Sequence, residues 1–258
     1  MPDHTTDPPT IEEHRPDYTA LTFPDPPPDR PYVIVNMVSS ADGKVTIEGT
    51  EQGIGSKTDQ RLMRELRVHA DIVINGASTL RASGTTSRTG DPALEQLRIQ
   101  RGKPPAPIAA VLSASGDLPF DRSFFTARDF EAVVYLSSDA PPDRRAAIEA
   151  TGRPVYDVPS GEEVPAMLRH MRHRLDARLL LVEGGPHLNG QLVEAGLVDE
   201  FFLTLGPVIV NGPGPLTAVT AARRPTIDAV TRLELLTAVP NPATGEVYLH
   251  YRVRKQTP

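Results

Sequence analysis

The sequence predicts an α/β fold built on one mixed sheet, mainly parallel, with antiparallel strands at its C-terminal end. Two observations support this prediction. From Tyr32 onward, short runs rich in β-branched residues alternate with amphipathic stretches of helical period, which is typical of parallel strands joined by helices. After residue 199, three apolar runs follow one another without a strong helical pattern between them, which is typical of antiparallel strands.

Each element of this sheet follows from a short apolar run bounded by turn residues. The parallel strands are expected at residues 32–38, 71–75, 107–113, 131–137, 154–158 and 178–183. Helices are expected between them at residues 57–69, 140–151, 162–175 and 186–196, and the pair Ser56 and Asp59 resembles a capping box for the first. The antiparallel strands are expected at residues 199–210, 231–240 and 245–255, with "NPATGE" as the turn before the last.

The first 30 residues differ in composition from the rest of the chain. They contain repeated proline, including "PDPPPDRP", mixed with acidic residues. Proline lacks an amide donor and fixes its own φ angle, so this segment does not suit a helix or a central strand. We expect an extended or disordered arm over residues 1–30 and a single domain over residues 31–258.

Composition excludes several classes of function. The 27 basic and 33 acidic residues give a net charge of -6 without a dense basic run, so no nucleic-acid partner is expected. No apolar stretch approaches the roughly 20 residues of a membrane span, and the N-terminus has no signal pattern, so a cytoplasmic protein is expected. The chain has no cysteine, which excludes thiolate chemistry and sulfur-ligated metals. His170 and His173 lie among arginines and suit a solvated helix face, so no metal site is expected.

The clearest candidate site follows the strand at residues 178–183. In open α/β sheets, ligands bind beyond the carboxyl ends of the strands. Gly184 and Gly185 let the backbone turn without a Cβ, and Pro186 suits the first helical turn, so the next amides would face an anion. The carboxylate of Glu183 needs a partner or ligand if it is buried. The alternative is a plain strand-to-helix turn.

Two further candidates also lie at strand exits. The stretch "NMVSSADGKV" offers polar groups at its strand end, and its alternative is an Asp-Gly turn with a solvated lysine. The stretch "INGASTLR" places a glycine, a hydroxyl and a guanidinium at the start of a helical turn, and its alternative is an ordinary helix cap. We expect all three exits to converge on one cleft, with candidate residues Asn36, Ser40, Asp42, Lys44, Gly76, Thr79 and Arg81.

Three stretches carry a resemblance to a known family. "SADGKV", "GSKTDQRLMRELRVHADIVINGASTLR" and "VEGGPHLNGQLVEAGLVDE" resemble the reductase domain of the bacterial riboflavin-biosynthesis deaminase/reductase, over about residues 31–255. The resemblance implies a dihydrofolate-reductase-like three-layer fold, an NADPH cofactor and a homodimer. It also implies reduction of 5-amino-6-(5-phosphoribosylamino)uracil to its ribitylamino form, by hydride transfer to the ribose C1.

The resemblance also implies roles for individual residues. Lys44 would handle a proton or pair with the substrate phosphate, Glu183 would orient the substrate hydroxyls, and Asp42 would line the same side. The other substrate-side residues would be Asn36, Ser40 and Arg67. The cofactor would contact Val38, Gly76, Thr79, Arg81, Ser113, Gly184, Gly185, Pro186 and Leu188, and Arg81 or Arg88 would meet its 2′-phosphate.

Two departures from the family pattern leave the substrate open. Where the family carries an Asp-Asp-Pro-x-Leu-Thr type of segment, this chain reads "LRASGTTSR", with Ser83 and Gly84 in place of carboxylates. The absence of cysteine excludes the deaminase zinc site. The alternatives are an NADPH-dependent reductase of a dihydrofolate-like pterin or another imine or carbonyl compound, and a nucleotide-binding module without turnover. The strand "EFFLTLGPVIV" would form either the dimer interface or central core.

Overall fold

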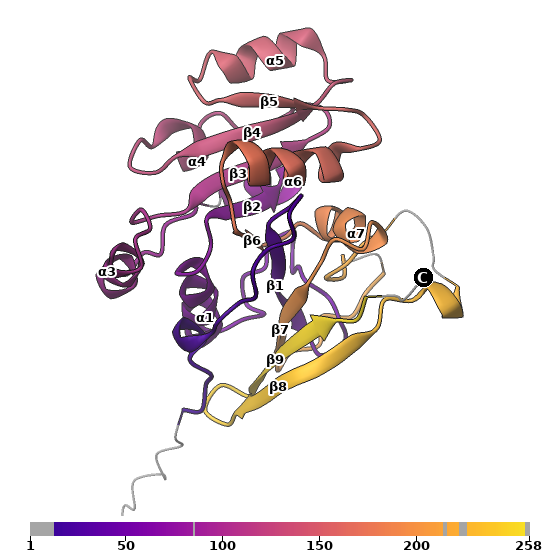
Figure 1. The fold of residues 1–258 in the computed structure, drawn as a ribbon. Helices are drawn as coiled ribbons and strands as arrows, with labels where there is room; N and C mark the ends of the chain where they lie inside the picture. Colours follow the sequence, from indigo (N-terminus) through magenta and orange to yellow (C-terminus); the bar gives the residue numbers. More distant parts are fainter. Residues whose placement is uncertain (1–12, 85, 214–215, 222–225, 256–258) are drawn as a thin grey trace, which may run out of the picture.

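One nine-stranded sheet forms the core of the computed structural model, which describes residues 13–84, 86–213, 216–221 and 226–255 (Figure 1). The strand order is β5-β4-β3-β2-β6-β1-β7-β9-β8. All neighbours from β5 to β7 are parallel, whereas β9 pairs antiparallel with both β7 and β8. The strands are β1 Tyr32–Ser40, β2 Ile72–Gly76, β3 Ile108–Ser113, β4 Ala132–Ser137, β5 Val155–Val158, β6 Leu179–Val182, β7 Glu200–Gly206, β8 Leu233–Asn241 and β9 Glu246–Val253. The predicted fold class and each predicted strand are confirmed.

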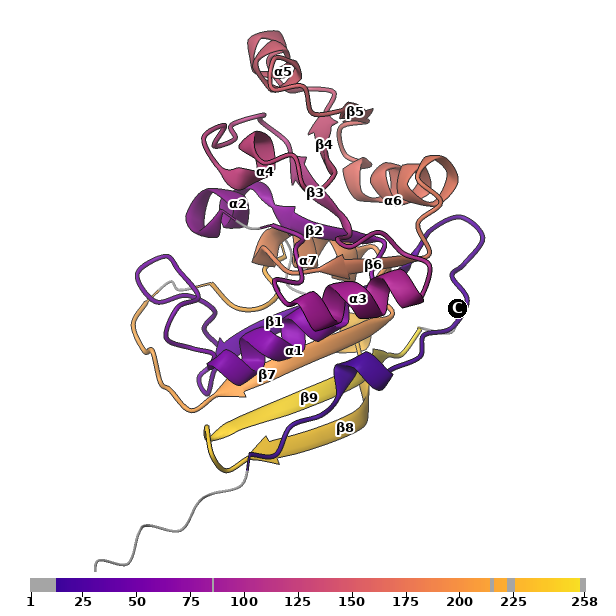
Figure 2. The same ribbon diagram turned by 90° about the vertical axis from the view of Figure 1, so that its left-hand side faces the viewer.

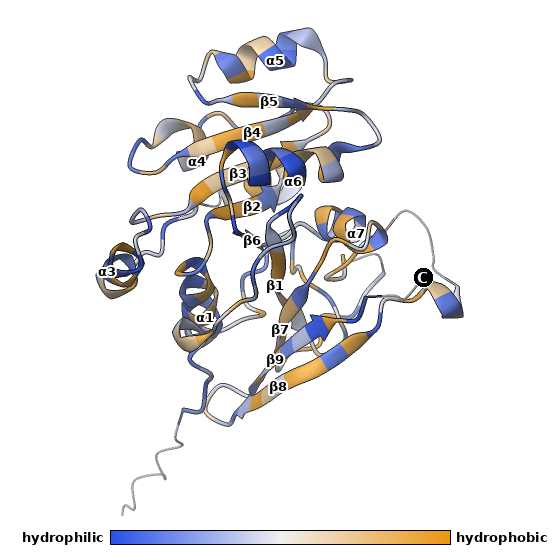
Figure 3. Cartoon of the chain, in the orientation of Figure 1, coloured by the Kyte–Doolittle hydropathy of each residue, from blue (hydrophilic) through white to orange (hydrophobic). Residues whose placement is uncertain are grey.

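Helices cover both faces of this sheet and make three layers. Apolar residues of α6 and α7 pack on one face, and those of α1, α2, α4 and α5 pack on the other. Figure 3 shows the apolar residues concentrated on the strands between these layers. The helices are α1 Lys57–Arg67, α2 Ala77–Ser83, α3 Pro92–Gln100, α4 Ser123–Thr126, α5 Pro142–Glu149, α6 Glu163–Arg174 and α7 Pro186–Glu194, with short 3-10 turns at Tyr18–Ala20 and Ile227–Ala229. Helices α3 and α4 are not among the predicted helices.

No helix in the described part of the chain has both the length and the apolar character that crossing a bilayer requires.

Groups from distant parts of the chain anchor α1 at both ends. At its start, the Ser56 hydroxyl accepts from the amides of Thr58 and Asp59, as the capping pattern predicts. Ser56 is itself held by Glu246 of β9, which accepts from its amide at 2.6 Å and from its hydroxyl at 2.7 Å. At the other end, Arg98 of α3 donates to the carbonyls of residues 67, 68 and 70. The carbonyls that a helix leaves unpaired at its end are thereby satisfied.

The segment before β1, expected to be an extended or disordered arm, is largely extended from residue 13 onward and packs beside α1 (Figure 2). The Glu65 carboxylate accepts from the amide of Tyr18 at 3.1 Å and from Arg15 at 2.8 Å. The ring of Tyr18 is buried and packs edge-on against Phe202, with ring centroids 5.1 Å apart. Residues 1–12 of the predicted arm lie outside the described residues.

Candidate active site

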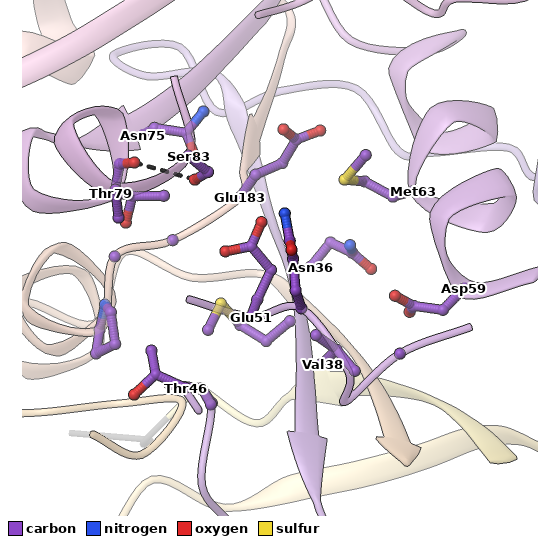
Figure 4. Close-up of a pocket in the computed structure, with 18 of the residues that line it drawn as sticks. Asn36, Val38, Thr46, Glu51, Asp59, Met63, Asn75, Thr79, Ser83 and Glu183 are labelled. Carbon is purple, nitrogen blue, oxygen red and sulfur yellow. Dashed lines mark hydrogen bonds between the residues drawn. The ribbon is translucent and has the colours of Figure 1, made fainter. Parts of the chain in front are cut away.

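A cavity of about 400 Å³ lies at the carboxyl ends of β1 and β6, between α1, α2 and the start of α7 (Figure 4). Its wall takes residues from β1, the loop between β1 and α1, α1 itself, β2, α2 and the segment that leads into α7. Figure 4 shows Thr79 and Ser83 on one side, Asp59 and Met63 on the other, and Asn36 between them. Ligand binding at this edge of the sheet is what strand exits of an open α/β fold predict.

The segment that leaves β6 supplies Glu183, Gly184, Gly185 and Pro186 to the wall, as the sequence predicts. Gly185 is the N-cap residue of α7, no side chain caps that end, and the peptide bond between the two glycines is cis. A Cβ on Gly185 would lie 2.8 Å from the Thr79 hydroxyl oxygen. The bare backbone therefore leaves a cradle between a hydroxyl and the free amides of a helix N-terminus, which suits an anion such as a pyrophosphate.

Glu183 meets the guanidinium of Arg67 in a two-point ion pair. Its two carboxylate oxygens accept from Nε and Nη2 of Arg67, each at 2.6 Å. Both side chains are buried, and a third nitrogen of Arg67 donates to the carbonyl of Arg88. Paired geometry of this kind is the strong form of an ion pair. The partner that a buried Glu183 requires is thus Arg67, which also lines the cavity as predicted.

Asp59 is a second buried carboxylate in the wall, and the sequence analysis assigned it only a capping role. Burial raises its pKa to about 6; a hydrogen bond from Thr204 lowers the pKa, and the charge of Glu246 raises it. Thr204 lies on β7 and Glu246 on β9, so neither is near Asp59 in the sequence. The capping pattern marked the first turn of α1 but gave no signal that its carboxylate enters a cavity.

Some residues at the end of β1 line the cavity, and others lie in the turn that follows the strand. Asn36 and Val38 line the cavity, whereas Ser40, Asp42 and Lys44 do not. Asp42 accepts from Ser40 at 2.7 Å and from the amides of residues 210 and 211, and these hydrogen bonds lower its pKa to about 2. The Lys44 amide donates to the Ser40 hydroxyl at 2.8 Å. This segment forms a turn because β1 continues two residues past Val38, and the roles of Ser40, Asp42 and Lys44 toward a ligand stay predictions.

The remaining cofactor candidates occupy different places. Thr79 lines the cavity, and the Gly76 amide holds the cradle by donating to the Gly184 carbonyl at 2.9 Å. Arg81 lies outside the lining and donates to the carbonyl of Asp117. Ser113 accepts from the amide of Gly116 at 3.0 Å, in a turn after β3 that does not line the cavity. Leu188 packs into the core, and Arg88 forms a two-point pair with Asp129.

Two polar groups of the wall have no protein partner within the described residues. The side-chain oxygen of Asn75 is buried and accepts no hydrogen bond. Arg64, one turn before Arg67 on α1, lines the cavity and forms no ion pair with a described residue. A buried acceptor and an unpaired guanidinium in one cavity fit a polar, anionic ligand.

Comparisons with known proteins point in the same direction. The family model described as the RibD C-terminal domain matches residues 31–238. A 2,5-diamino-6-ribosylamino-4(3H)-pyrimidinone 5′-phosphate reductase from Aquifex aeolicus is 30% identical over 201 residues, 74% of this chain and 83% of that protein.

Two solved structures share the fold. A pyrimidine reductase-like protein from Corynebacterium diphtheriae superposes with a TM-score of 0.78 at 23% identity, over 88% of this chain and 94% of that one. A diaminohydroxyphosphoribosylaminopyrimidine deaminase/5-amino-6-(5-phosphoribosylamino)uracil reductase from Thermotoga maritima gives 0.65 at 20% identity, over 87% of this chain and 57% of that one. The antiparallel C-terminal strands and the helices on both faces therefore belong to a fold that these proteins share.

Proposed function

The chain belongs to the RibD C-terminal domain family, and from that premise we propose that it is an NADPH-dependent reductase of a ribosylaminopyrimidine phosphate in riboflavin biosynthesis. The reaction adds a hydride to C1 of the ribose, in its open-chain imine form, and a proton to the attached nitrogen, which gives the ribitylamino product. The observation that carries the proposal is that the glycine cradle and the Glu183–Arg67 pair line the same cavity.

The residues around the cradle fit the cofactor. The free amides at the start of α7 and the Thr79 hydroxyl would hold its pyrophosphate, and the unpartnered oxygen of Asn75 would accept from an amide group. When bound, NADPH supplies the hydride, and the protein fixes the distance and orientation between the two reacting carbons. Arg81 and Arg88 are each engaged with an acidic residue, so their contact with a 2′-phosphate stays a prediction.

The substrate would lie on the α1 side of the cavity. Arg64 supplies an unpaired guanidinium there, and Arg67 lies within the same helical face, so the phosphate would be held at this end. Asn36 and Glu51 line the centre of the cavity, where they would meet the sugar hydroxyls. The Glu183 carboxylate fixes Arg67 at two points, so it would act by holding that guanidinium in place.

Turnover with defined substrates tests this function. NADPH oxidation by the purified full chain is measured with the 2,5-diamino-pyrimidinone ribosyl phosphate, with the aminouracil ribosyl phosphate and with dihydrofolate. We expect oxidation with a ribosylaminopyrimidine and none with dihydrofolate. Oxidation with dihydrofolate alone would support the pterin alternative, and cofactor binding without any turnover would support the binding module.

A substitution in the cradle tests the cofactor position. Gly185→Val places a branched side chain against the Thr79 hydroxyl and over the α7 amides, so we expect the Kd for NADPH to rise about 100-fold. Ala195→Val, at the exposed far end of the same helix, is the matched control and should leave the Kd unchanged. Calorimetric titration checks both variants, and equal affinity in Gly185→Val would move the cofactor elsewhere.

We also propose a homodimer, for which the structure favours a different strand from the one the sequence suggested. β7 lies inside the sheet between β1 and β9, so it forms central core and offers no free edge. β8 is the edge strand on this side of the sheet instead. On it, Leu233 is 41% exposed and Leu235 is 52% exposed. An apolar edge of this kind is a typical interface between copies of a chain. Light scattering on the purified protein checks the proposal, and a monomer at micromolar concentration contradicts it.

A further inference from the structure

Asp59 is a buried carboxylate in the cavity wall, and no cation of the described residues lies beside it. Its residue is 9% exposed, and no Lys, Arg or His in the described part of the chain pairs with it. Glu183, the other buried carboxylate of the wall, already holds Arg67 at two points. A carboxylate buried without a cation costs free energy unless a ligand supplies hydrogen-bond donors. Its place in the wall therefore indicates a ligand with donors at this position.

The neighbours of Asp59 hold its carboxylate without satisfying it. From β7, the Thr204 hydroxyl donates one hydrogen bond. From β9, Glu246 contributes a second negative charge, and Glu246 is already satisfied by Ser56 and by the Tyr248 hydroxyl at 2.6 Å. From the arm, the ring of Tyr18 feels the charge of Asp59, which raises the pKa of the tyrosine in addition to the larger effect of burial. No positive group faces Asp59 from these elements.

The surrounding backbone keeps the space beside Asp59 fixed. A Cβ on Gly55 would lie 2.4 Å from the nearer carboxylate oxygen, so only glycine leaves this carboxylate in place. The same added atom would lie 3.2 Å from a methyl group of Val38 in the cavity floor. The carboxylate is thus confined between α1, β1 and the preceding loop, and Asp59 lines the cavity there (Figure 4).

Asp59 and Arg67 mark opposite ends of one helical face. They are separated by two turns of α1, about 12 Å along the axis at 1.5 Å per residue, and Met63 lies between them in the lining. The guanidinium end suits the phosphate of the proposed substrate. The carboxylate end then receives the opposite end of that molecule, which is the pyrimidine ring.

The two pyrimidines named for related reductases differ where a carboxylate would meet them. The 2,5-diamino-4(3H)-pyrimidinone carries N3–H beside a 2-amino group, so this edge presents two donors. The aminouracil carries N3–H beside a 2-oxo group, so its edge presents one donor and one acceptor. A carboxylate has two acceptor oxygens and no donor, so it complements the first edge and repels the carbonyl of the second.

We propose that Asp59 binds the N3–H and 2-amino edge of the pyrimidine and selects the 2-amino ring over the 2-oxo ring. This inference rests on the proposed function and makes Asp59 a specificity-determining residue of that reaction. The discrimination arises because the wrong ring leaves a buried carboxylate facing a carbonyl oxygen, which is the kind of mismatch that sites reject strongly.

The variant Asp59→Asn tests the proposal. An amide offers one acceptor and one donor, which complements the uracil edge instead. We expect wild-type kcat/KM to favour the diamino substrate by at least about 100-fold. In Asp59→Asn this ratio should fall by more than the whole wild-type preference, to a value below 1, so that the aminouracil becomes the better substrate. Asp143→Asn, also on the first turn of a helix but exposed on α5, is the matched control and should keep the wild-type ratio.

A pH profile of the wild-type enzyme gives a second measurement, with Asp59→Asn as its control. The ionised form of Asp59 has two acceptors, and its pKa is about 6 in the free protein. The KM for the diamino substrate should therefore rise as pH falls below 6, with no such rise in Asp59→Asn.

The outcomes separate the two proposals. A wild-type enzyme that reduces neither pyrimidine overturns the proposed function and this inference with it. A wild-type enzyme that reduces either pyrimidine, with a preference that Asp59→Asn leaves unchanged or with a KM that does not vary between pH 5 and 8, overturns the role of Asp59 alone.

Discussion

Two carboxylates of the same cavity wall, at the exit of β6 and on the first turn of α1, have opposite surroundings. Glu183 is clamped by two 2.6 Å hydrogen bonds from Arg67, whereas Asp59 has a hydroxyl and a second carboxylate as its polar neighbours. A buried charge that is paired inside the protein has a structural role, because it holds its partner in place. A buried charge that the protein leaves without a cation points to the chemistry of the ligand.

The largest expected effect comes from leaving Glu183, at the exit of β6, without a cation, as Asp59 is on the first turn of α1. Arg67→Met removes the only cation that pairs with Glu183 among the described residues, and leaves that carboxylate buried. We expect the free energy of unfolding to fall by about 3–5 kcal/mol and turnover to fall more than about 100-fold. Urea unfolding and NADPH oxidation measure the two effects. Arg81→Met, in an exposed pair, should change stability by less than about 1 kcal/mol; an equally small change in Arg67→Met would show that Glu183 does not depend on this pair.

A smaller effect of opposite sign is expected at Asp59. Because its folded pKa, about 6, is above the ordinary aspartate value of 3.8, the folded state binds the proton more tightly, and stability is lost as pH rises from about 4 to 6. Asp59→Asn removes this loss. The variant should match wild type below pH 4 and exceed its unfolding free energy by up to about 3 kcal/mol at pH 7. Denaturant titrations across this range check the difference, and a less stable variant at pH 7 would reveal a favourable partner for the ionised carboxylate.

The smallest effect is expected at Lys44, which lies in the turn after β1. Its side chain does not line the cavity, so Lys44→Ala should change kcat by less than about threefold, or about 0.7 kcal/mol in activation free energy. Steady-state kinetics with saturating NADPH provide the measurement. A 100-fold loss would restore the proton-handling or phosphate-pairing role that the resemblance implies.

Most of the fold was predictable because local pattern and final structure agree. The strands are short apolar runs with turn residues at their ends, and such runs become the buried centre of a layered α/β fold. Helix α3 was missed although Asp91 caps it and Pro92 begins it, because its apolar residues form no stripe and its buried face includes Arg98. A helix that packs through a buried guanidinium has no hydrophobic period to detect.

The site was predictable in part, for a related reason. Residues at strand exits were found because strand ends mark an edge of the sheet, and the structure brings Asn36, Thr79 and Glu183 to one cavity. Asp59 was not found because the groups that act on its carboxylate, Thr204 of β7 and Glu246 of β9, come from the far end of the sequence. Ser40, Asp42 and Lys44 lie outside the cavity lining because β1 continues two residues past Val38, which the sequence does not show.

Because α1 is anchored at both ends, it holds Asp59 and Arg67 at a fixed spacing. Glu246 fixes its first turn and Arg98 fixes its last, so the spacing between Asp59 and Arg67 cannot adjust to a longer or shorter molecule. A ring and a phosphate joined by a five-carbon sugar would span the two turns, whereas a three-carbon spacer would leave one end unmatched. If the proposed placement holds, α1 selects the length of the sugar through a stretch of backbone that need not touch it.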